Sequence, residues 1–502
     1  MSLHSAAALA LAAAGWIAPR RVAGARFATA PAMLLDAAPL SVVAAVLFVA
    51  SGRPLLAGAI AFALGAGFAF ADRTVRATLR EPVVFSALAE LPQIFTHPHL
   101  YLPFAGTATV LSASAGAVLA PIALLIAEPP AATPRPLGAA LALAGVVALL
   151  WRVGREPWLA PVARALRRLR PSGEPFADAS RLGPVAMLIV HGVVARAERP
   201  ARQARLAPLP GRPPRLGPCA PPALRPRPVV LVQCESFFDA RRALPTLPRG
   251  LLSGYDAACA AGEHGRLAVP AWGANTMRAE FAVLTGLPEA ALGYDRFNPY
   301  HALARVPLAS QVRRLRAAGY RTLCLHPFDR GFFRRDRALA ALGFDEFLGR
   351  ETLGGARRPP YMSDPALADC ILRSLDRGDP RVFVFAITMG NHGPWPKDRG
   401  WETYLAGLQQ SDEMLRRLLE GLRRRGDDAL LGFYGDHLPS LPARFAALGF
   451  DDWRSDYVVW SAAGMAPRRR DLTADEFGRA FADLALAPEP ADAAVVAALP
   501  PA

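Results

Sequence analysis

The first 155 residues contain five long apolar stretches with few charged positions inside them. A helix that crosses a bilayer needs about 20 apolar residues, within a range of about 17–25. Three of the stretches meet this length, and the first and last are shorter. The stretches are Ser5–Pro19, Met33–Ala50, Leu55–Ala71, Phe104–Ala127 and Leu137–Trp151. This pattern predicts an α-helical transmembrane domain of about five helices over residues 1–155.

The first stretch also has the small residues that are typical of a signal peptide. However, Met1–His4 carries no Lys or Arg, and four more apolar stretches follow. We therefore interpret Ser5–Pro19 as a span.

The pattern changes between residues 156 and 227. Leu182–Ala195 is apolar but short and contains His191, so it fits either a sixth crossing or an interfacial helix. Residues 199–228 then contain ten prolines, which lack a backbone N–H and break regular elements. We interpret 156–227 as a basic, proline-rich juxtamembrane linker that is extended from residue 199. A domain boundary is expected near Pro228.

From residue 228 to 502, short runs of β-branched and aromatic residues alternate with amphipathic stretches. The expected strands are Val229–Cys234, Arg321–Leu325, Val382–Ile387, Leu430–Tyr434 and Tyr457–Trp460. The expected helices include Leu308–Ala318, Arg335–Leu342, Pro365–Asp376 and Trp401–Arg424. Apolar strands separated by helices predict an α/β domain with a mostly parallel sheet covered by helices on both faces.

Charge separates the two halves of the chain. The formal net charge is +15, and residues 1–227 hold 23 Arg against 9 acidic residues, a net of +14. Because the α/β half is nearly neutral, a nucleic-acid partner is disfavoured. Arginines follow the first, third and fifth apolar stretches, so the positive-inside rule would place these loops in the cytoplasm. With five spans the α/β domain would then be cytoplasmic, whereas a sixth crossing would reverse this.

The five cysteines do not decide the compartment. They are odd in number and lack CxxC spacing.

Polar residues follow three of the expected strands, at the ends where α/β sheets gather functional groups. Glu235 follows the first of these strands, His392 lies just beyond Val382–Ile387, and Asp436 and His437 follow the next. Two carboxylates and an imidazole suit Mn²⁺, Mg²⁺ or Zn²⁺. Each of these residues taken singly also has an ordinary interpretation, such as a cap or a salt bridge.

Thr276 precedes a helical run, Met277–Leu284. A helix N-terminus favours an anion, and a hydroxyl next to a divalent cation can act as a nucleophile. On spacing alone, a threonine in this place is more often an N-cap. The order of these groups along the chain predicts a metal-assisted site with a phospho-threonine intermediate.

Four motifs together resemble those of the membrane phosphoglycerol transferases of the lipoteichoic acid synthase type, within the alkaline phosphatase/sulfatase superfamily. The motifs are VVLVQCESFFD (229–239), GANTMRAEFAVLTG (273–286), FVFAITMGNHGPW (383–395) and GFYGDHLP (432–439). The resemblance covers both halves of the chain. It implies a sulfatase-like catalytic domain over residues 228–502.

The resemblance also implies roles for individual residues. One divalent cation, typically Mn²⁺ with Mg²⁺ or Zn²⁺ as alternatives, would be bound by Glu235, Thr276, Asp436 and His437, with Thr276 as the catalytic nucleophile. The implied substrate-binding residues are His392, Arg335, His326 and Phe333. Arg334 is an alternative to its neighbour Arg335, and the family usually has Trp where Phe333 stands. Classical sulfatases carry a C/S-x-P-x-R motif that GANTMRA lacks, so sulfate-ester hydrolysis is disfavoured.

The function implied by the resemblance is transfer of phosphoglycerol from phosphatidylglycerol to an envelope glycan or polyol. The catalytic domain would then lie outside the cytoplasmic (inner) membrane, in contact with membrane lipids and opposite to the side that the loop charges indicate. Phosphoethanolamine transfer, hydrolysis of a phosphodiester or sulfate ester, and an inactive membrane scaffold are the alternatives.

Overall fold

The computed structural model describes most of the chain. The described residues are 2–26, 29–208, 227–303, 306–376, 379–396, 398–426 and 428–487. They form two compact units, which are described one at a time. The units comprise residues 1–201 with 293–297, and residues 202–292 with 298–502.

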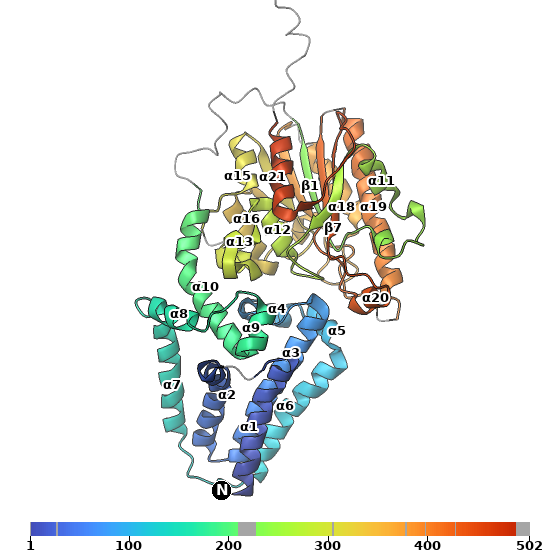
Figure 1. The fold of residues 1–502 in the computed structure, drawn as a ribbon. Helices are drawn as coiled ribbons and strands as arrows, with labels where there is room; N and C mark the ends of the chain where they lie inside the picture. Colours follow the sequence, from blue (N-terminus) through green and yellow to red (C-terminus); the bar gives the residue numbers. More distant parts are fainter. Residues whose placement is uncertain are drawn as a thin grey trace, which may run out of the picture. The chain divides into compact units, whose positions relative to one another are not determined.

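The first unit is helical (Figure 1). Its long helices are α1 (Leu3–Val22), α2 (Ala30–Ser51), α3 (Pro54–Leu79), α6 (Thr107–Ala127) and α7 (Pro136–Val153). Its shorter helices are α4 (Leu91–Thr96), α5 (Pro98–Ala105), α8 (Leu159–Arg167) and α9 (Pro175–Leu182). Helix α10 (Pro184–Leu206) begins in this unit. All five apolar stretches of the sequence are therefore helical.

Among the described residues, four helices, α2, α3, α6 and α7, are long and apolar enough to cross a membrane by length and composition. None of the 18-residue apolar window of α6 is buried within the structure, and only 6% of that of α7 is. So much exposed apolar helix surface needs a lipid environment. The protein is therefore membrane-bound.

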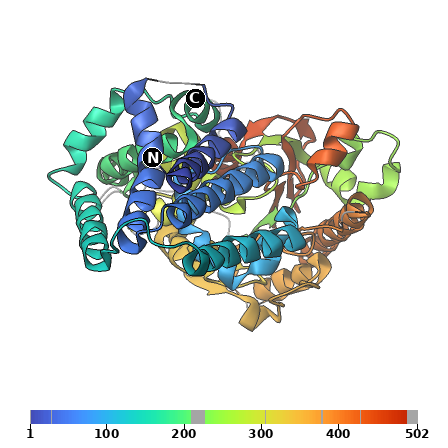
Figure 2. The same ribbon diagram turned by 90° about the horizontal axis from the view of Figure 1, so that it is seen from below.

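Helices α1 and α3 lie side by side (Figures 1 and 2). A Cβ on Gly65 would lie 2.0 Å from the carbonyl oxygen of Gly15, so the two backbones approach more closely than any larger residue allows. Arg20 of α1 forms a buried ion pair with Asp36 of α2, with 2.7 Å between Nη1 and Oδ2. Small residues and one ion pair thus hold these helices together.

Helix α10 corrects the prediction of an extended chain from residue 199. The helix continues through Pro200 to Leu206, because the residues after Pro200 are good helix formers. Nine of the ten prolines lie beyond Leu206, and residues 209–226, with Cys219, lie outside the described residues. The apolar stretch that could have been a sixth crossing contributes to α10, which is not among the four candidate spans.

The second unit is built on one mixed sheet. Its strands are β1 (Val229–Cys234), β2 (Gly262–Ala268), β3 (Arg321–Leu325), β4 (Glu346–Leu348), β5 (Val382–Ile387), β6 (Leu430–Gly435), β7 (Ser455–Ser461), β8 (Arg468–Arg469) and β9 (Leu472–Thr473). The order is β4-β3-β5-β1-β6-β7-β2-β8, with β9 also paired to β2. The neighbours from β4 to β6 are parallel, whereas β7 is antiparallel to both β6 and β2.

Helices cover both faces of this sheet (Figure 1). One face packs against α12 (Thr276–Thr285), α15 (Gln311–Ala317), α16 (Arg335–Leu342) and α21 (Ala474–Ala485). The other packs against α11 (Ser253–Cys259), α18 (Asp364–Leu375) and α19 (Gly400–Arg425). Short helices are α13 (Glu289–Leu292), α14 (Pro299–Leu303), α17 (Arg350–Leu353) and α20 (Pro442–Ala447). The predicted α/β class is confirmed, although strands β2, β4, β8 and β9 were not predicted.

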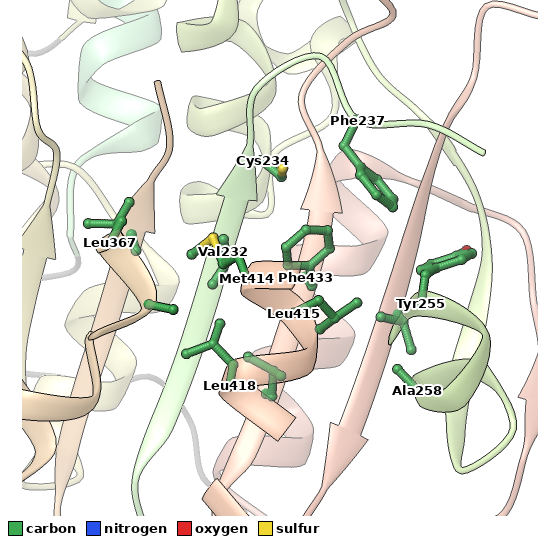
Figure 3. Close-up of a cluster of buried hydrophobic side chains, with 14 of the residues drawn as sticks. Val232, Cys234, Phe237, Tyr255, Ala258, Leu367, Met414, Leu415, Leu418 and Phe433 are labelled. Carbon is green, nitrogen blue, oxygen red and sulfur yellow. The ribbon is translucent and has the colours of Figure 1, made fainter. Parts of the chain in front are cut away.

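Alternate side chains of each central strand enter different cores. In β1, Val229 and Leu231 join the core under α12, whereas Val230 and Val232 join the core under α19. Figure 3 shows the second core, where Val232 and Phe433 of adjacent strands lie near side chains of α19. Burial on both faces explains why these strands read as continuous apolar runs.

Candidate active site

The strand register brings the two acidic residues together. Cys234, the last residue of β1, lies opposite Gly435, the last residue of β6. Glu235 and Asp436 are the next residues on these parallel strands and leave the same edge of the sheet. Ser236 then turns the chain in the left-handed conformation, with φ of 57°.

Gly435 makes the close packing of these two loops possible. A Cβ at this position would lie 1.8 Å from the carbonyl oxygen of Phe237. Gly435 ends β6 and leaves the space that the two loops need.

Glu235, Asp436 and His437 form a buried cluster that could hold a metal ion. One ligand atom from each residue lies within 4.8 Å of the others. His437 Nε2 is 3.6 Å from Glu235 Oε1 and 3.3 Å from Asp436 Oδ2. Asp436 Oδ1 accepts hydrogen bonds from the backbone N–H groups of Ser236 and His437, whereas buried Oδ2 has no hydrogen-bond partner among the described residues. A buried carboxylate oxygen without a hydrogen-bond partner is well suited to bind a cation.

The imidazole of His437 has a suitable orientation for the same role. Its Nδ1 lies 3.0 Å from the carbonyl oxygen of Leu438, to which an Nδ1–H donates. The lone pair of Nε2 is then directed at the two carboxylates. This arrangement, in which a backbone carbonyl fixes the tautomer, is common for metal-binding histidines.

The electrostatics of the cluster also favour a bound cation. Burial, and then the negative charge of Asp436, raise the pKa of Glu235 to about 8. Two carboxylates packed together in this way repel one another when both are ionised. A divalent cation offsets that repulsion, so the residues present fit such a group.

Thr276 lies beside this cluster. It is the first residue of α12, and Asn275 precedes it in the left-handed conformation. Its Oγ1 is 3.4 Å from His437 Nε2, and its side chain is buried. The N-cap interpretation of Thr276 is wrong, because Asn275 occupies the N-cap position. The hydroxyl is therefore presented to the Glu235–Asp436–His437 cluster at the N-terminus of a helix, where an anion is favoured.

Arg335 enters the site from the first turn of α16. Its guanidinium group is buried and forms an ion pair with Glu280 of α12, with 2.9 Å between Nη2 and Oε2. Its Nη1 lies 3.3 Å from Nε2 of His326, whose Nδ1 faces the carbonyl oxygen of Ile387. Burial, and then the adjacent Arg335 charge, hold the pKa of His326 well below its usual range. His326 is therefore a neutral acceptor for Arg335.

The remaining predicted residues lie near these groups. Phe333 places its ring 5.3 Å from the Arg335 guanidinium carbon, and Arg334 is half-buried. His392 donates from Nδ1 to the carbonyl oxygen of Gly393, which leaves Nε2 as an acceptor. Burial lowers the pKa of His392, so its neutral form is favoured. The positive charge of Arg335 contributes in the same direction.

Sequence reasoning missed several supporting residues. Glu280 binds Arg335, Thr388 accepts a hydrogen bond from the backbone N–H of Glu235, and Ser236 donates to the Glu235 carboxylate. Only Glu280 carried a signal, because it follows Thr276 by four residues and so shares its helix face. Thr388 depends on a contact between the ends of β1 and β5, whereas Ser236 is the next residue after Glu235 in the chain.

The fold and the donor set define a membrane-bound α/β protein with a candidate metal site beside a buried hydroxyl. The family model described as Sulfatase matches residues 227–485, slightly more than half of the chain. The chain therefore belongs to the sulfatase family of enzymes, in the alkaline phosphatase superfamily.

Individual relatives cover different parts of the chain. The capsular polysaccharide biosynthesis protein RkpI of Rhizobium meliloti is 34% identical over 262 residues, which is 48% of this chain and 47% of that protein. The chain thus matches about half the length of this curated relative. The phosphoglycerol transferase GacH of Streptococcus pyogenes, solved with sn-glycerol-1-phosphate, has a TM-score of 0.44 and 22% identity, covering 51% of this chain and 73% of that one.

One solved structure is similar over both halves. The integral membrane lipooligosaccharide phosphoethanolamine transferase A of Neisseria meningitidis has a TM-score of 0.50 and 14% identity. The match covers 89% of this chain and 92% of that chain. At this identity the likeness concerns the fold alone.

Proposed function

We propose that the protein transfers phosphoglycerol from phosphatidylglycerol to an envelope glycan or polyol through a covalent bond to Thr276. The observation that carries the proposal is the Thr276 hydroxyl, 3.4 Å from His437 Nε2 at the edge of the Glu235–Asp436–His437 cluster. The four motifs that resemble phosphoglycerol transferases support the choice of donor. The similarity to RkpI, a protein named for capsular polysaccharide biosynthesis, supports a glycan acceptor.

The residues of the chain would divide the chemistry into two steps. Thr276 Oγ attacks the phosphorus, the bond to the diacylglycerol oxygen breaks, and that oxygen takes the proton. In the second step an acceptor hydroxyl attacks the phosphorus, the bond from phosphorus to Thr276 Oγ1 breaks, and that oxygen takes up the proton that the acceptor loses. His392, neutral with Nε2 as an acceptor, suits the base that takes the proton of the acceptor hydroxyl. Arg335 would bind the phosphate oxygens, with Phe333 beneath its guanidinium group.

A divalent cation held by Glu235, Asp436 and His437, which we propose is Mn²⁺, would increase the nucleophilicity of the threonine hydroxyl and offset charge on the phosphate. Thr276 Oγ1 would complete its ligand set.

The test is incubation of the purified full chain with head-group-labelled phosphatidylglycerol and Mn²⁺. We expect release of diacylglycerol and label on Thr276, identified by peptide mass spectrometry. Thr276→Ala should abolish both, whereas Thr352→Ala, a change at an exposed threonine of α17, should leave both unchanged. Normal turnover by Thr276→Ala would exclude the covalent mechanism.

Phosphoethanolamine transfer is the second candidate. It is favoured by the fold similarity to phosphoethanolamine transferase A over 89% of this chain. The same assay with head-group-labelled phosphatidylethanolamine separates the two candidates, because only the true donor should label Thr276.

We also propose that the second unit lies outside the inner membrane, where lipid donor and glycan acceptor meet. A cysteine introduced at exposed Thr352 should then react with a membrane-impermeant maleimide in intact spheroplasts. Labelling only after lysis would place this unit in the cytoplasm and exclude an envelope glycan as the acceptor.

A further inference from the structure

Glu280 is a buried acid that the chemistry above does not use. It lies on α12 one helical turn after Thr276, so both side chains leave the same face of the helix. Its side chain is fully buried and paired with Arg335. The nucleophile and the partner of the phosphate-binding arginine therefore share one rigid element.

The hydrogen bonds around Glu280 fix its carboxylate from several directions. Tyr300 donates its hydroxyl to Oε1 over 2.5 Å, and Gln233 Nε2 lies 3.3 Å from Oε2. Gln233 is held in turn by the hydroxyl of Tyr434, 2.5 Å from its Oε1. The acid that contacts Arg335 is thus held by Tyr300 and by Gln233 of strand β1, and Tyr434 holds Gln233.

The hydrogen bonds of Arg335 show which of its N–H donors are available to a ligand. A guanidinium group has five N–H donors. Nε and Nη2 each direct one at Glu280, and Nη1 directs one at His326. One N–H on Nη1 and one on Nη2 therefore remain without a partner among the described residues. Two such donors match a phosphate group.

A buried ion pair such as this one is weak evidence for a stabilising role. Burying two charges costs a desolvation penalty, and apolar residues of similar volume are often as stable. Arg335 also lies near the reaction centre, because its ion-pair partner Glu280 is on the same helix as Thr276, four residues further along. A pair in this place can determine where the arginine donors point.

We propose that Glu280 is a positioning residue that orients Arg335, so that its two remaining N–H groups bind the phosphate of the donor. The proposal rests on the proposed phosphoryl transfer at Thr276. In this proposal His326 also orients Arg335, because its neutral imidazole accepts a hydrogen bond from Nη1. Arg335 itself contacts the phosphate.

The test is a double-mutant cycle of Glu280→Gln and Arg335→Gln in the full-length, Mn²⁺-loaded protein. Glu280→Gln has nearly the shape of the native side chain but lacks the charge that fixes the guanidinium group. We expect at least a tenfold loss of kcat/KM, including at least a threefold rise in KM. Loss of folded protein would lower the apparent kcat and leave KM unchanged. The double variant should be within twofold of Arg335→Gln alone, because Glu280 acts through Arg335.

A matched control is Glu413→Gln on α19, a half-buried acid that pairs with Arg416 and Arg417. It should retain wild-type kinetics. Bound Mn²⁺ should be equal in all variants, since Glu280 is not a ligand.

The proposal is wrong if the kcat/KM of Glu280→Gln is within twofold of the wild-type value. It is also wrong if the fold-losses of kcat/KM of the two single variants multiply in the double variant. The cycle is measured on phosphatidylglycerol and on bis(4-nitrophenyl) phosphate, a diester with no glycerol or lipid. Failure on phosphatidylglycerol alone contradicts the proposed donor and leaves the Glu280–Arg335 coupling measurable. Wild-type protein that cleaves neither diester contradicts both proposals.

Discussion

Substitution of Gly435 by Ala tests how the strand ends build the metal site. The added Cβ would lie 1.8 Å from the Phe237 carbonyl oxygen, whereas real contacts of this kind stay above 3.0 Å. The loop after β1 and the end of β6 must therefore separate by more than about 1 Å, because both atoms are held by backbone. Glu235 lies on the first of these segments and Asp436 on the second.

The expected effect on metal binding is large. Ligand distances in a metal site tolerate changes of only about 0.2 Å. We therefore expect Gly435→Ala to weaken Mn²⁺ binding at least tenfold, measured by titration of the metal-free full chain. Overpacking should also destabilise the fold by about 1–3 kcal/mol, which lowers the melting temperature by several degrees.

The matched control is Gly250→Ala. An added Cβ there meets nothing within 4 Å, so metal affinity and melting temperature should stay at wild-type values. Gly435→Ala protein with normal Mn²⁺ affinity and an unchanged melting temperature would refute the reasoning that close approach of the two loops sets the site.

Three further changes test other parts of the structure. Thr276→Ser keeps a hydroxyl and should retain measurable donor turnover that Thr276→Ala lacks, as measured by diacylglycerol release; equal rates for the two would contradict a nucleophilic hydroxyl. Phe385→Ala should destabilise the fold by about 3–5 kcal/mol, because the ring is fully buried in the central strand β5; a loss below 1 kcal/mol in chemical denaturation would show that the core collapses around the gap. Burial raises the pKa of Asp364 to about 6, so its folded state binds a proton more tightly than the unfolded state and stability falls as pH rises from about 4 to about 6. Asp364→Asn cannot ionise, so the fall in its free energy of unfolding between pH 4 and pH 7 should be smaller than that of wild type by up to about 3 kcal/mol. Melting curves of both proteins at the two pH values measure this difference.

The sequence predicted the elements whose pattern is local. The five strands from Val229–Cys234 to Tyr457–Trp460 are all present, with small differences at their ends. Their long apolar runs directly reflect burial on both faces of the sheet. Strand β2 was missed because Gly262–Ala268 contains polar residues at an edge region of the sheet, where burial alternates.

Proline content misled the prediction for residues 199–206. One proline in a helix of 23 residues removes one hydrogen bond, which the neighbouring helix-forming residues outweigh.

Part of the candidate site could also be predicted from local sequence, and part depends on long-range contacts. The residue types and their order after successive strands were enough to indicate Glu235, Thr276, Asp436 and His437 as a group. Only the tertiary structure decided that Asp436 Oδ2 is buried without a hydrogen-bond partner among the described residues, and that Arg335 is bound by Glu280. Both facts depend on contacts between residues 55–200 positions apart, since Ser236 meets Asp436 and Glu280 meets Arg335 across different elements. A sequence pattern specifies which face a side chain leaves, but strand register and helix packing specify which side chain it meets.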